Sequence, residues 1–311
     1  MIDALSKSFF HTLAGSSALK SLASTYGMRN AHSFARRFIA GETLEEAIGA
    51  ARQIEARGQT LTLDLLGESV TSLDAAAAAT KTYLGIIDQV VQAGITRNIS
   101  LKLTQLGLDL DPARAADHLR LILDAAQKAG FFVRIDMENS PYVDVTLDIW
   151  ETVWNQGFKN VGVVLQSALH RSEQDLRRVI AAGGRVRLVK GAYKEPREVA
   201  HQAKSDVDAA FVRMMQVLLA EGAFPAIATH DEKMIAATRE FAAAHGIGKD
   251  GYEFQLLFGV RRDLQAALHG EGYGMRVYLP YGREWFPYFM RRLGERPANV
   301  GFVVRGILSE R

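Results

Sequence analysis

Short runs of apolar residues alternate with longer stretches of helical periodicity along most of the chain. Each apolar run has about the length of a strand and is rich in Val, Ile, Leu or Phe. The predicted strands are 61–66, 98–103, 131–136, 161–166, 186–190, 224–229, 252–257 and 275–279. The clearest helical patterns between them are 74–92, 113–129, 173–182, 206–221 and 232–245. The chain therefore repeats a strand and a helix eight times.

Glycine stands between most helical patterns and the strand that follows. These positions are Gly58, Gly94, Gly130, Gly157, Gly183, Gly222, Gly246 and Gly270. Glycine takes the left-handed conformation that ends many helices without a steric penalty, so these residues are predicted helix stops. A strand can begin directly after such a stop.

Strands that alternate with helices pair in parallel through right-handed crossovers. Eight such units favour a closed (β/α)8 barrel of the TIM type over an open doubly wound sheet. The first strand starts near Leu61, which leaves about 250 residues for the barrel, the usual size of that fold. We therefore predict an α/β protein with N-terminal helices over residues 1–57 and the barrel over residues 58–311. The clearest N-terminal helix is 43–57, with Thr43 as its cap.

The N-terminal helices carry an uneven charge. No acidic residue occurs between Ala4 and Gly41, whereas five Lys or Arg residues do. A transit peptide or a helix on a membrane surface has this composition. A helical cap packed against the barrel is the alternative, and it is the interpretation we favour.

The composition narrows the classes of function. Of the 311 residues, 48% are hydrophobic, which is enough for a core and excludes a disordered chain. A formal net charge of +2 argues against a dedicated nucleic-acid-binding protein, whose basic excess would be larger. The chain has no cysteine, so disulfides, thiolate zinc sites and cysteine nucleophiles are excluded. No apolar run approaches the ~18–20 residues that cross a membrane.

Polar and charged residues gather at the predicted carboxyl ends of the strands, where barrel enzymes have their active sites. They are Asp64, Glu68, Lys102, Asp136, Glu138, Gln166, Arg187, Lys190, Thr229, His230, Asp231, Glu253, Gln255 and Tyr278. One charged strand residue alone is more often structural than functional. Such residues on all eight strands indicate a site.

The cationic members of this set indicate an anionic ligand. They are Lys102, Arg187 and Lys190 in the barrel and Arg291 and Arg292 in the predicted last helix. Arg binds carboxylate or phosphate through two parallel hydrogen bonds, and Lys binds as a point charge. The glycine after Lys190 would let the backbone approach a phosphate. A solvated helix face, with Arg291 paired to Glu295, is the alternative for the two arginines.

Two further patterns, a match to a dinucleotide-binding motif and a set of possible metal ligands, do not predict the sites that they suggest. Residues 246–251 match the pattern GxGxxG, but they follow a helix and precede a strand, which is the reverse of the dinucleotide-binding context. Asp136, Glu138, His230 and Glu253 could in principle hold a divalent metal. No two histidines have the helical spacing of metal ligands, so we predict no metal site.

Taken together and in order, several motifs resemble those of monofunctional proline dehydrogenases. Residues 187–193, Arg-Leu-Val-Lys-Gly-Ala-Tyr after the fifth strand, are similar to the flavin-binding signature of that family. Further similar segments are 134–138, 229–231, 253–259, 278–282 and 288–299. The resemblance spans essentially the whole barrel. Bifunctional members continue into an aldehyde dehydrogenase, for which 311 residues are too few, and they tend to have Trp where Lys194 stands.

The resemblance implies FAD-dependent oxidation of L-proline to Δ1-pyrroline-5-carboxylate, with electrons passed to a quinone that is expected to be membrane-borne. It implies that Asp136 and Arg187 are catalytic, with Arg187 beside the flavin N5 atom. The implied substrate-binding residues are Lys102, Arg291 and Arg292 for the carboxylate and Tyr193, Leu257 and Tyr278 for the ring. The implied FAD contacts are Met137, Gln166, Arg187, Val189, Lys190, Gly191, Ala192, Thr229 and His230.

Two alternatives stay open at the level of the sequence. The first is a Schiff-base aldolase on the same barrel, which would use Lys102 or Lys190 as its nucleophile. The second is a ligand-binding barrel without turnover. For the cell, we predict a cytoplasmic protein that does not bind nucleic acid, with peripheral contact at the inner face of the membrane as an option.

Overall fold

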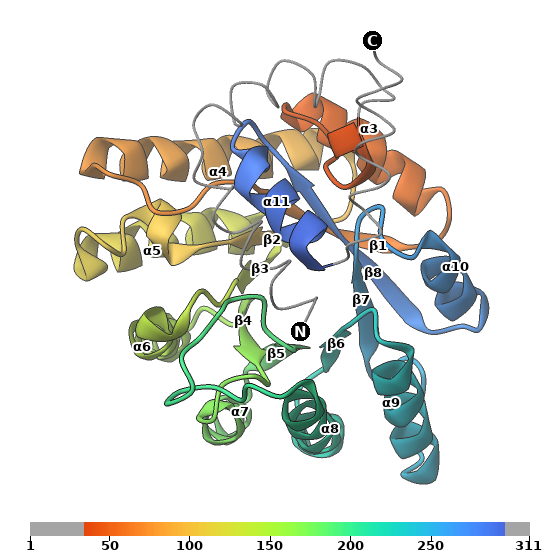
Figure 1. The fold of residues 1–311 in the computed structure, drawn as a ribbon. Coiled ribbons are helices and arrows are strands. Elements are labelled where there is room, and N and C mark those ends of the chain that lie inside the picture. The colour runs from red at the N-terminus through yellow and green to blue at the C-terminus, as the bar shows by residue number, and fades with distance from the viewer. Residues whose placement is uncertain (1–33, 296–311) are drawn as a thin grey trace.

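The computed structural model describes residues 34–295, and its centre is a closed barrel of eight parallel strands. Consecutive strands pair, and β8 closes the barrel on β1 (Figure 1). The strands are β1 Thr60–Leu65, β2 Asn98–Leu101, β3 Phe132–Ile135, β4 Val161–Gln166, β5 Arg185–Val189, β6 Ala226–Ala228, β7 Glu253–Leu257 and β8 Gly274–Tyr281. All eight strands predicted from the sequence are therefore confirmed, and so is the (β/α)8 barrel.

Helices surround the barrel (Figure 1). The α-helices are α3 Leu44–Glu55, α4 Leu73–Ala93, α5 Pro112–Lys128, α6 Val143–Asn155, α7 Ser172–Ala181, α8 Lys204–Glu221, α9 Glu232–Ala244, α10 Arg262–Gly270 and α11 Trp285–Glu295. Short 3-10 helices cover Phe34–Arg37 (η1), Leu103–Leu106 (η2) and Ser140–Tyr142 (η3). The predicted helices agree with these bounds to within two residues. Residues 246–251 form the loop between α9 and β7, which agrees with their rejection as a dinucleotide motif.

Local signals explain where helices begin and end. The Ser72 side chain accepts a hydrogen bond from the Ala75 amide at the start of α4. Gly94 ends the same helix in the left-handed conformation, with φ of 67°, as predicted. The same prediction is wrong for Gly222, which ends α8 in an extended conformation with φ of −85°. Its ideal Cβ would meet the carbonyl oxygen of Leu218 at 2.5 Å, so close packing rather than backbone handedness favours glycine there.

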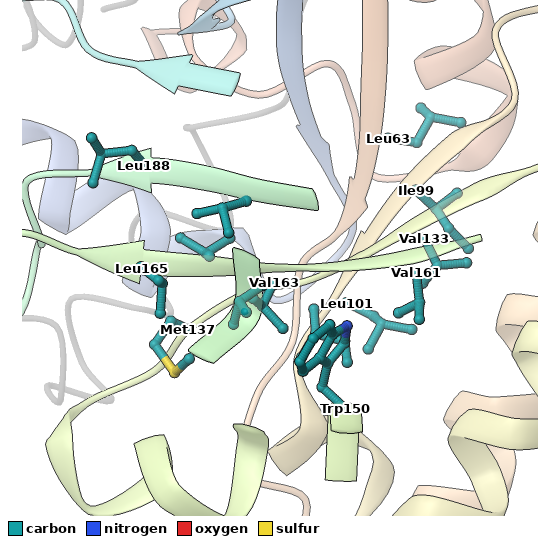
Figure 2. Close-up of a cluster of buried hydrophobic side chains, with 14 of the residues drawn as sticks. Leu63, Ile99, Leu101, Val133, Met137, Trp150, Val161, Val163, Leu165 and Leu188 are labelled. Atoms are coloured by element: carbon teal, nitrogen blue, oxygen red, sulfur yellow. The ribbon is translucent and has the colours of Figure 1, made fainter. Parts of the chain in front are cut away.

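The main hydrophobic core lies between the barrel and its helices. Outward-facing strand residues such as Leu63, Ile99 and Val163 are buried against it, and Trp150 of α6 joins them without any exposed surface (Figure 2). Side chains alternate along a strand, so the residues between these apolar ones face the barrel interior. That interior is where the polar residues lie.

The described part of the N-terminal segment packs on the barrel. Helix α3 begins with a capping box made by Thr43 and Glu46, and its buried Ala51 and Ile54 belong to the same core as Leu61 of β1. The acid-free stretch is described only from residue 34 onward, so the question of a membrane-surface helix lies largely outside the described residues. The boundary between residues 57 and 58 stays a prediction. No helix within residues 34–295 is both long and apolar enough to span a bilayer.

A second, smaller core joins the two ends of the described chain. Phe38 packs with Trp285 and Phe289 of α11 and with Leu66, which follows β1. The rings of Phe38 and Phe289 lie 6.3 Å apart between their centres. This packing fixes α11 over the carboxyl end of β1 and so determines where its two arginines lie.

Candidate active site

The interior of the barrel is lined with polar side chains that bond across it. Arg187 of β5 donates hydrogen bonds to Ser100 of β2, to Gln255 of β7 and to Asp136, which follows β3. Because β5 is paired only with β4 and β6, these bonds cross the interior of the barrel. The carboxyl halves of the strands thus converge on Arg187.

Arg187 and Asp136 form the centre of the site. Arg187 is only 4% exposed, and its Nη1 lies 2.8 Å from Oδ1 of Asp136. Tyr278 of β8 donates a hydrogen bond of 2.6 Å from its hydroxyl to the other carboxylate oxygen, Oδ2. Burial and the charge of Asp136 raise the pKa of Tyr278 well above its usual value. The phenol therefore stays protonated and can act as a donor at neutral pH.

Lys102 lies beside this centre, at the end of β2. Its Nζ atom is 4.0 Å from Oδ2 of Asp136 and 3.9 Å from Oδ1 of Asp64, and the side chain is buried. Burial favours the neutral amine, but the two carboxylates outweigh it and hold the pKa of Lys102 above its usual value. Both distances are too long for a hydrogen bond. Lys102 is therefore a charged ammonium whose donors do not bond these carboxylates.

Asp64, near the end of β1, is not among the site residues that the sequence predicts. It has no exposed surface, and neither of its carboxylate oxygens accepts a hydrogen bond within the described chain. Burial raises its pKa, which the neighbouring Lys102 opposes. The sequence signal that could have identified it is an acid in a strand whose other residues are Leu and Thr.

Arg291 and Arg292 approach the same end of the barrel from α11. Arg291 donates a hydrogen bond of 3.1 Å to Glu68 in the β1–α4 loop, and its side chain is only 17% exposed. The Arg292 guanidinium is buried and lies 5.0 Å from the ring centre of Tyr288. The alternative of a solvated helix face is therefore wrong for this pair. Residues 297 and 299 of the matching motif lie outside the described residues.

Tyr193 lies close to both Lys102 at the end of β2 and Arg291 of α11. Burial raises the pKa of its hydroxyl to about 12, and the charges of Lys102 and Arg291 oppose that rise. Both cations are therefore within electrostatic reach of the same phenol. The fold brings Lys102, Tyr193 and Arg291 together although they are far apart in the sequence.

Gln166 and Glu138 form the adjoining rim. Gln166 at the end of β4 donates a hydrogen bond of 2.8 Å to the backbone carbonyl of Glu138. Thr104 donates a hydrogen bond of 2.7 Å to the Glu138 carboxylate. Burial raises the pKa of Glu138 to about 7, against the effects of the Thr104 bond and the Lys102 charge. Gly191 has a φ of 112°, and a Cβ there would lie 3.1 Å from Oε1 of Gln166.

Lys190 is directed away from the central cluster. Its ammonium forms ion pairs with Asp208 of α8 and with Asp231, which caps α9. The Asp231 pair is 2.6 Å long and helps to lower the pKa of that carboxyl to about 2, although burial opposes this. Lys204 pairs with the same two aspartates, so Lys190 belongs to a rim network of two lysines and two aspartates.

The other predicted cofactor and ring contacts lie at the ends of neighbouring strands. His230 accepts a hydrogen bond of 3.0 Å at Nε2 from the Leu257 amide, and the Thr229 hydroxyl accepts one of 3.1 Å from the Asp231 amide. Val189 is the last residue of β5, and Ala192 follows it in the irregular stretch before α8. The Met137 side chain belongs to the hydrophobic core (Figure 2). These residues surround the cluster, but their roles stay predictions.

Glu253 lies at the opposite end of the barrel, so its predicted position at the carboxyl ends is wrong. It is the first residue of β7, and Arg276 donates a hydrogen bond of 2.9 Å to it. Gln255 donates a second bond of 2.6 Å to the same oxygen. Within residues 34–295, no three His, Asp or Glu side chains are grouped closely enough to hold a metal ion.

The sequence is similar to proteins of the proline dehydrogenase family. A family model described as "Proline dehydrogenase" matches residues 47–305. Proline dehydrogenase 2 of Bacillus subtilis is 40% identical over 306 residues, which is 98% of this chain and 100% of that protein. Proline dehydrogenase of Deinococcus radiodurans is 41% identical over 313 residues, which is 99% of this chain and 100% of that protein.

A solved structure has the same barrel. It is that of proline utilization A (PutA) from Bdellovibrio bacteriovorus inactivated by N-propargylglycine, with a TM-score of 0.78 and 26% identity. The match covers 84% of this chain but only 32% of that one. The present chain therefore corresponds to about a third of that longer protein.

Proposed function

Because the chain belongs to the proline dehydrogenase family, we propose that it oxidises L-proline to Δ1-pyrroline-5-carboxylate with FAD as its cofactor and a quinone as the final electron acceptor. The observation that carries the proposal is the cluster of Lys102, Asp136, Arg187 and Tyr278 at the carboxyl ends of the strands, in which Lys102 and Arg187 are buried. In this reaction proline loses a hydride from the ring carbon next to nitrogen and a proton from the nitrogen. A carbon–nitrogen double bond forms between those atoms.

The residues present fit a flavin. When bound, FAD supplies the acceptor for the hydride. Gly191, with its positive φ and its close approach to Gln166, lets the backbone of the β5–α8 connection come near a ligand where a side chain would clash. The further contacts that we propose are Met137, Val189, Lys190, Ala192, Thr229 and His230.

Arg187 would stabilise negative charge on the reduced flavin ring. Its guanidinium is fixed by Asp136, Gln255 and Ser100, so it needs no reorganisation when the charge develops. Asp136 holds both Arg187 and Tyr278 through its two oxygens and thereby sets their relative orientation. We propose these two residues, Asp136 and Arg187, as the catalytic pair.

The substrate carboxylate would bind to the cations at the mouth of the barrel. Lys102 is charged and makes no hydrogen bond to either neighbouring carboxylate, so it can donate to a ligand. Arg291 and Arg292 would complete a three-cation clamp that fixes the acid end of proline. The aromatic rings of Tyr193 and Tyr278, with Leu257, would enclose the apolar ring. Fixing both ends places the reacting carbon in one orientation, which lowers the barrier to transfer.

The Schiff-base alternative conflicts with the environment of both lysines. A Schiff-base lysine attacks as the neutral amine and therefore needs a lowered pKa. The carboxylates around Lys102 raise its pKa instead, and Lys190 is held by Asp208 and Asp231. A barrel that binds its ligand without turnover differs from the proposal in activity alone.

Purified protein, incubated with FAD and freed of excess cofactor, tests the proposal. We expect flavin absorption bands, L-proline-dependent reduction of a dye acceptor, and a cyclic imine product that an aromatic amino-aldehyde traps. Retained flavin without turnover would favour the ligand-binding barrel. A colourless protein that is trapped by borohydride with a carbonyl substrate would contradict the proposal in favour of the aldolase.

We extend the proposal to the electron acceptor and its location. A membrane-borne quinone would take the electrons, and the enzyme would act in the cytoplasm with peripheral contact at the inner face of the membrane. The support is the acid-free, basic composition of residues 4–41. Co-sedimentation of the full chain with anionic vesicles, and quinone reduction that is faster on those vesicles than on neutral ones, are the expected results. Equal rates on both would contradict the membrane contact.

A further inference from the structure

Asp64 is a buried acid for which the proposed reaction has no role. It has no exposed surface, and neither oxygen accepts a hydrogen bond within residues 34–295. A buried carboxylate normally has partners for its oxygens, because leaving them without any destabilises the folded protein. The ion-pair partner of Asp64 is Lys102, at 3.9 Å. A group kept at such a cost needs an explanation.

The two carboxylates on either side of Lys102 differ in what else they hold. Asp136 is engaged by Arg187 on one oxygen and by Tyr278 on the other. Asp64 faces Lys102 from β1, and Tyr278 lies close enough to act on it without forming a hydrogen bond of normal geometry. Arg187 and Tyr278 also act on the charge of Asp64, but within residues 34–295 its one ion pair is with Lys102, whereas Asp136 forms a closer ion pair with Arg187.

We propose that Asp64 is a positioning residue that keeps the Lys102 ammonium charged and directed toward the carboxylate of the substrate. The inference rests on the proposed function, in which Lys102 binds that carboxylate. Asp64 itself does not touch the substrate in this scheme. Its distance of 3.9 Å is close enough to stabilise the charge of Lys102 and too long to occupy its donors.

The other groups that face Lys102 do not replace Asp64. Asp136, Glu68, Glu138 and Tyr193 act on it electrostatically, but Asp136 is shared with Arg187 and Glu68 with Arg291. Glu138 is bonded to Thr104, and its pKa of about 7 leaves it partly neutral near neutral pH. Without Asp64, burial of the lysine would favour the neutral amine as the pH rises. Carboxylate binding would then weaken in alkaline solution.

The test measures binding without turnover. Cyclopentanecarboxylate has the carboxylate and the five-membered ring of proline but no nitrogen to oxidise. Calorimetric titration of the flavin-loaded enzyme would give its Kd at about pH 7 and about pH 9.5, on either side of the range in which a lysine without its carboxylate partner would titrate. The variants are Asp64→Asn, which keeps the shape and removes the charge, Lys102→Met, and the double variant.

We expect Asp64→Asn to raise Kd about tenfold at the higher pH and less at the lower pH, the scale of one charged hydrogen bond. For the wild type, Kd should change little between the two. In the Lys102→Met background, Asp64→Asn should have no further effect on Kd, because the residue through which it acts is gone. A double variant that binds more weakly than Lys102→Met alone would overturn the proposal, as would an Asp64→Asn variant with wild-type Kd at both pH values.

Asp175→Asn is the matched control. Asp175 is also a buried acid, but it lies in α7 and pairs with Arg171. Its substitution should leave Kd unchanged at both pH values. If Lys102→Met binds as well as the wild type, the carboxylate-binding role of Lys102 fails and the inference fails with it. If only Asp64→Asn is without effect, the proposed function stands and the inference alone fails.

Thermal unfolding gives a second measurement that does not depend on the ligand. Asp64→Asn leaves a buried ammonium with less compensation, so its Tm should fall, and adding Lys102→Met should restore part of the loss. If Asp64→Asn does not fold, Asp64→Ser, which leaves room for water, replaces it in the same series. A double variant less stable than both single variants would contradict a specific pairing of the two charges.

Discussion

Charged residues of both signs lie at both ends of the barrel interior, but the distances between them differ. At the amino end, Glu253 accepts hydrogen bonds from Arg276 and Gln255, at 2.9 and 2.6 Å. At the carboxyl end, Lys102 lies 3.9 Å from one carboxylate and 4.0 Å from another. Both ends are buried and both carry charges of each sign. Arg187 and Asp136 also pair at the carboxyl end, at 2.8 Å, but Lys102 there lies beyond hydrogen-bond distance of both of its carboxylates.

Because of this difference, Lys102 has hydrogen-bond donors left for a ligand. At the amino end the Arg276–Glu253 pair stabilises the fold, whereas at the carboxyl end the Arg187–Asp136 pair fixes a guanidinium within the proposed site. Charges held slightly too far apart to bond one another keep their donors for a substrate, at a cost in stability. The residue types alone do not distinguish the Arg276–Glu253 pair from Lys102 and its carboxylates. The distances between the charged atoms distinguish them.

The largest expected effect on stability lies at the amino end. Glu253→Gln leaves the half-buried Arg276 without its carboxylate partner, so we expect a loss of up to about 3 kcal/mol in the free energy of unfolding. Arg276 also holds the pKa of Glu253 below its usual value against the effect of burial. The wild-type advantage should therefore be present at neutral pH and lost as the pH falls through the lowered pKa. Urea unfolding at several pH values measures both effects. Equal stability of the two proteins would show that this end does not serve the fold as described.

The largest expected effect on activity is that of Arg187→Met at the carboxyl end. Removing a preorganised cation from the reacting region should lower kcat for proline about 10²–10³-fold, or about 3–4 kcal/mol. Steady-state oxidation with a dye acceptor measures it, on protein checked for retained flavin. A fall in unfolding free energy as large as that of Glu253→Gln, with kcat preserved, would reverse the assignment of the two ends.

Glu138 should give a pH effect in the opposite direction to that of Glu253. Its pKa of about 7 in the folded protein is higher than the usual value of 4.5. Its protonated form therefore favours folding below the unfolded pKa, and this contribution is lost as the pH rises through about 7. The difference corresponds to up to about 3 kcal/mol. In Glu138→Gln the decline of stability between pH 5 and pH 8 should be smaller. A wild type whose stability rises over that range because of Glu138 would contradict its burial as the cause.

The smallest of the four effects belongs to the clamp. Arg291→Ala and Arg292→Ala should each raise KM for proline at least about tenfold, the scale of one charged hydrogen bond. Their kcat at saturation should change less, because neither residue contacts the reacting carbon in the proposed scheme. An unchanged KM in both variants would remove them from the carboxylate site.

Much of this architecture could be predicted from the chain. The eight strands and their order follow from local periodicity and from helix stops such as Gly94, because these signals act within a few residues. The end of the barrel at which Glu253 lies could not be predicted, because it depends on where β7 begins. The pairing of Arg291 with Glu68 depends on how α11 packs over β1. Asp64 was visible as an acid in a strand, but its missing hydrogen bonds are a property of the folded interior.

The rate at which L-proline reduces the bound flavin in the absence of oxygen tests the comparison most directly. Arg187 and Glu253 are joined through Gln255, so both variants disturb the same chain of hydrogen bonds from opposite ends. We predict that Glu253→Gln bleaches the flavin within about threefold of the wild-type rate and that Arg187→Met is at least about 100-fold slower. Equal slowing by both variants would contradict the account, because the charges at the amino end would then serve the reaction as well as the fold.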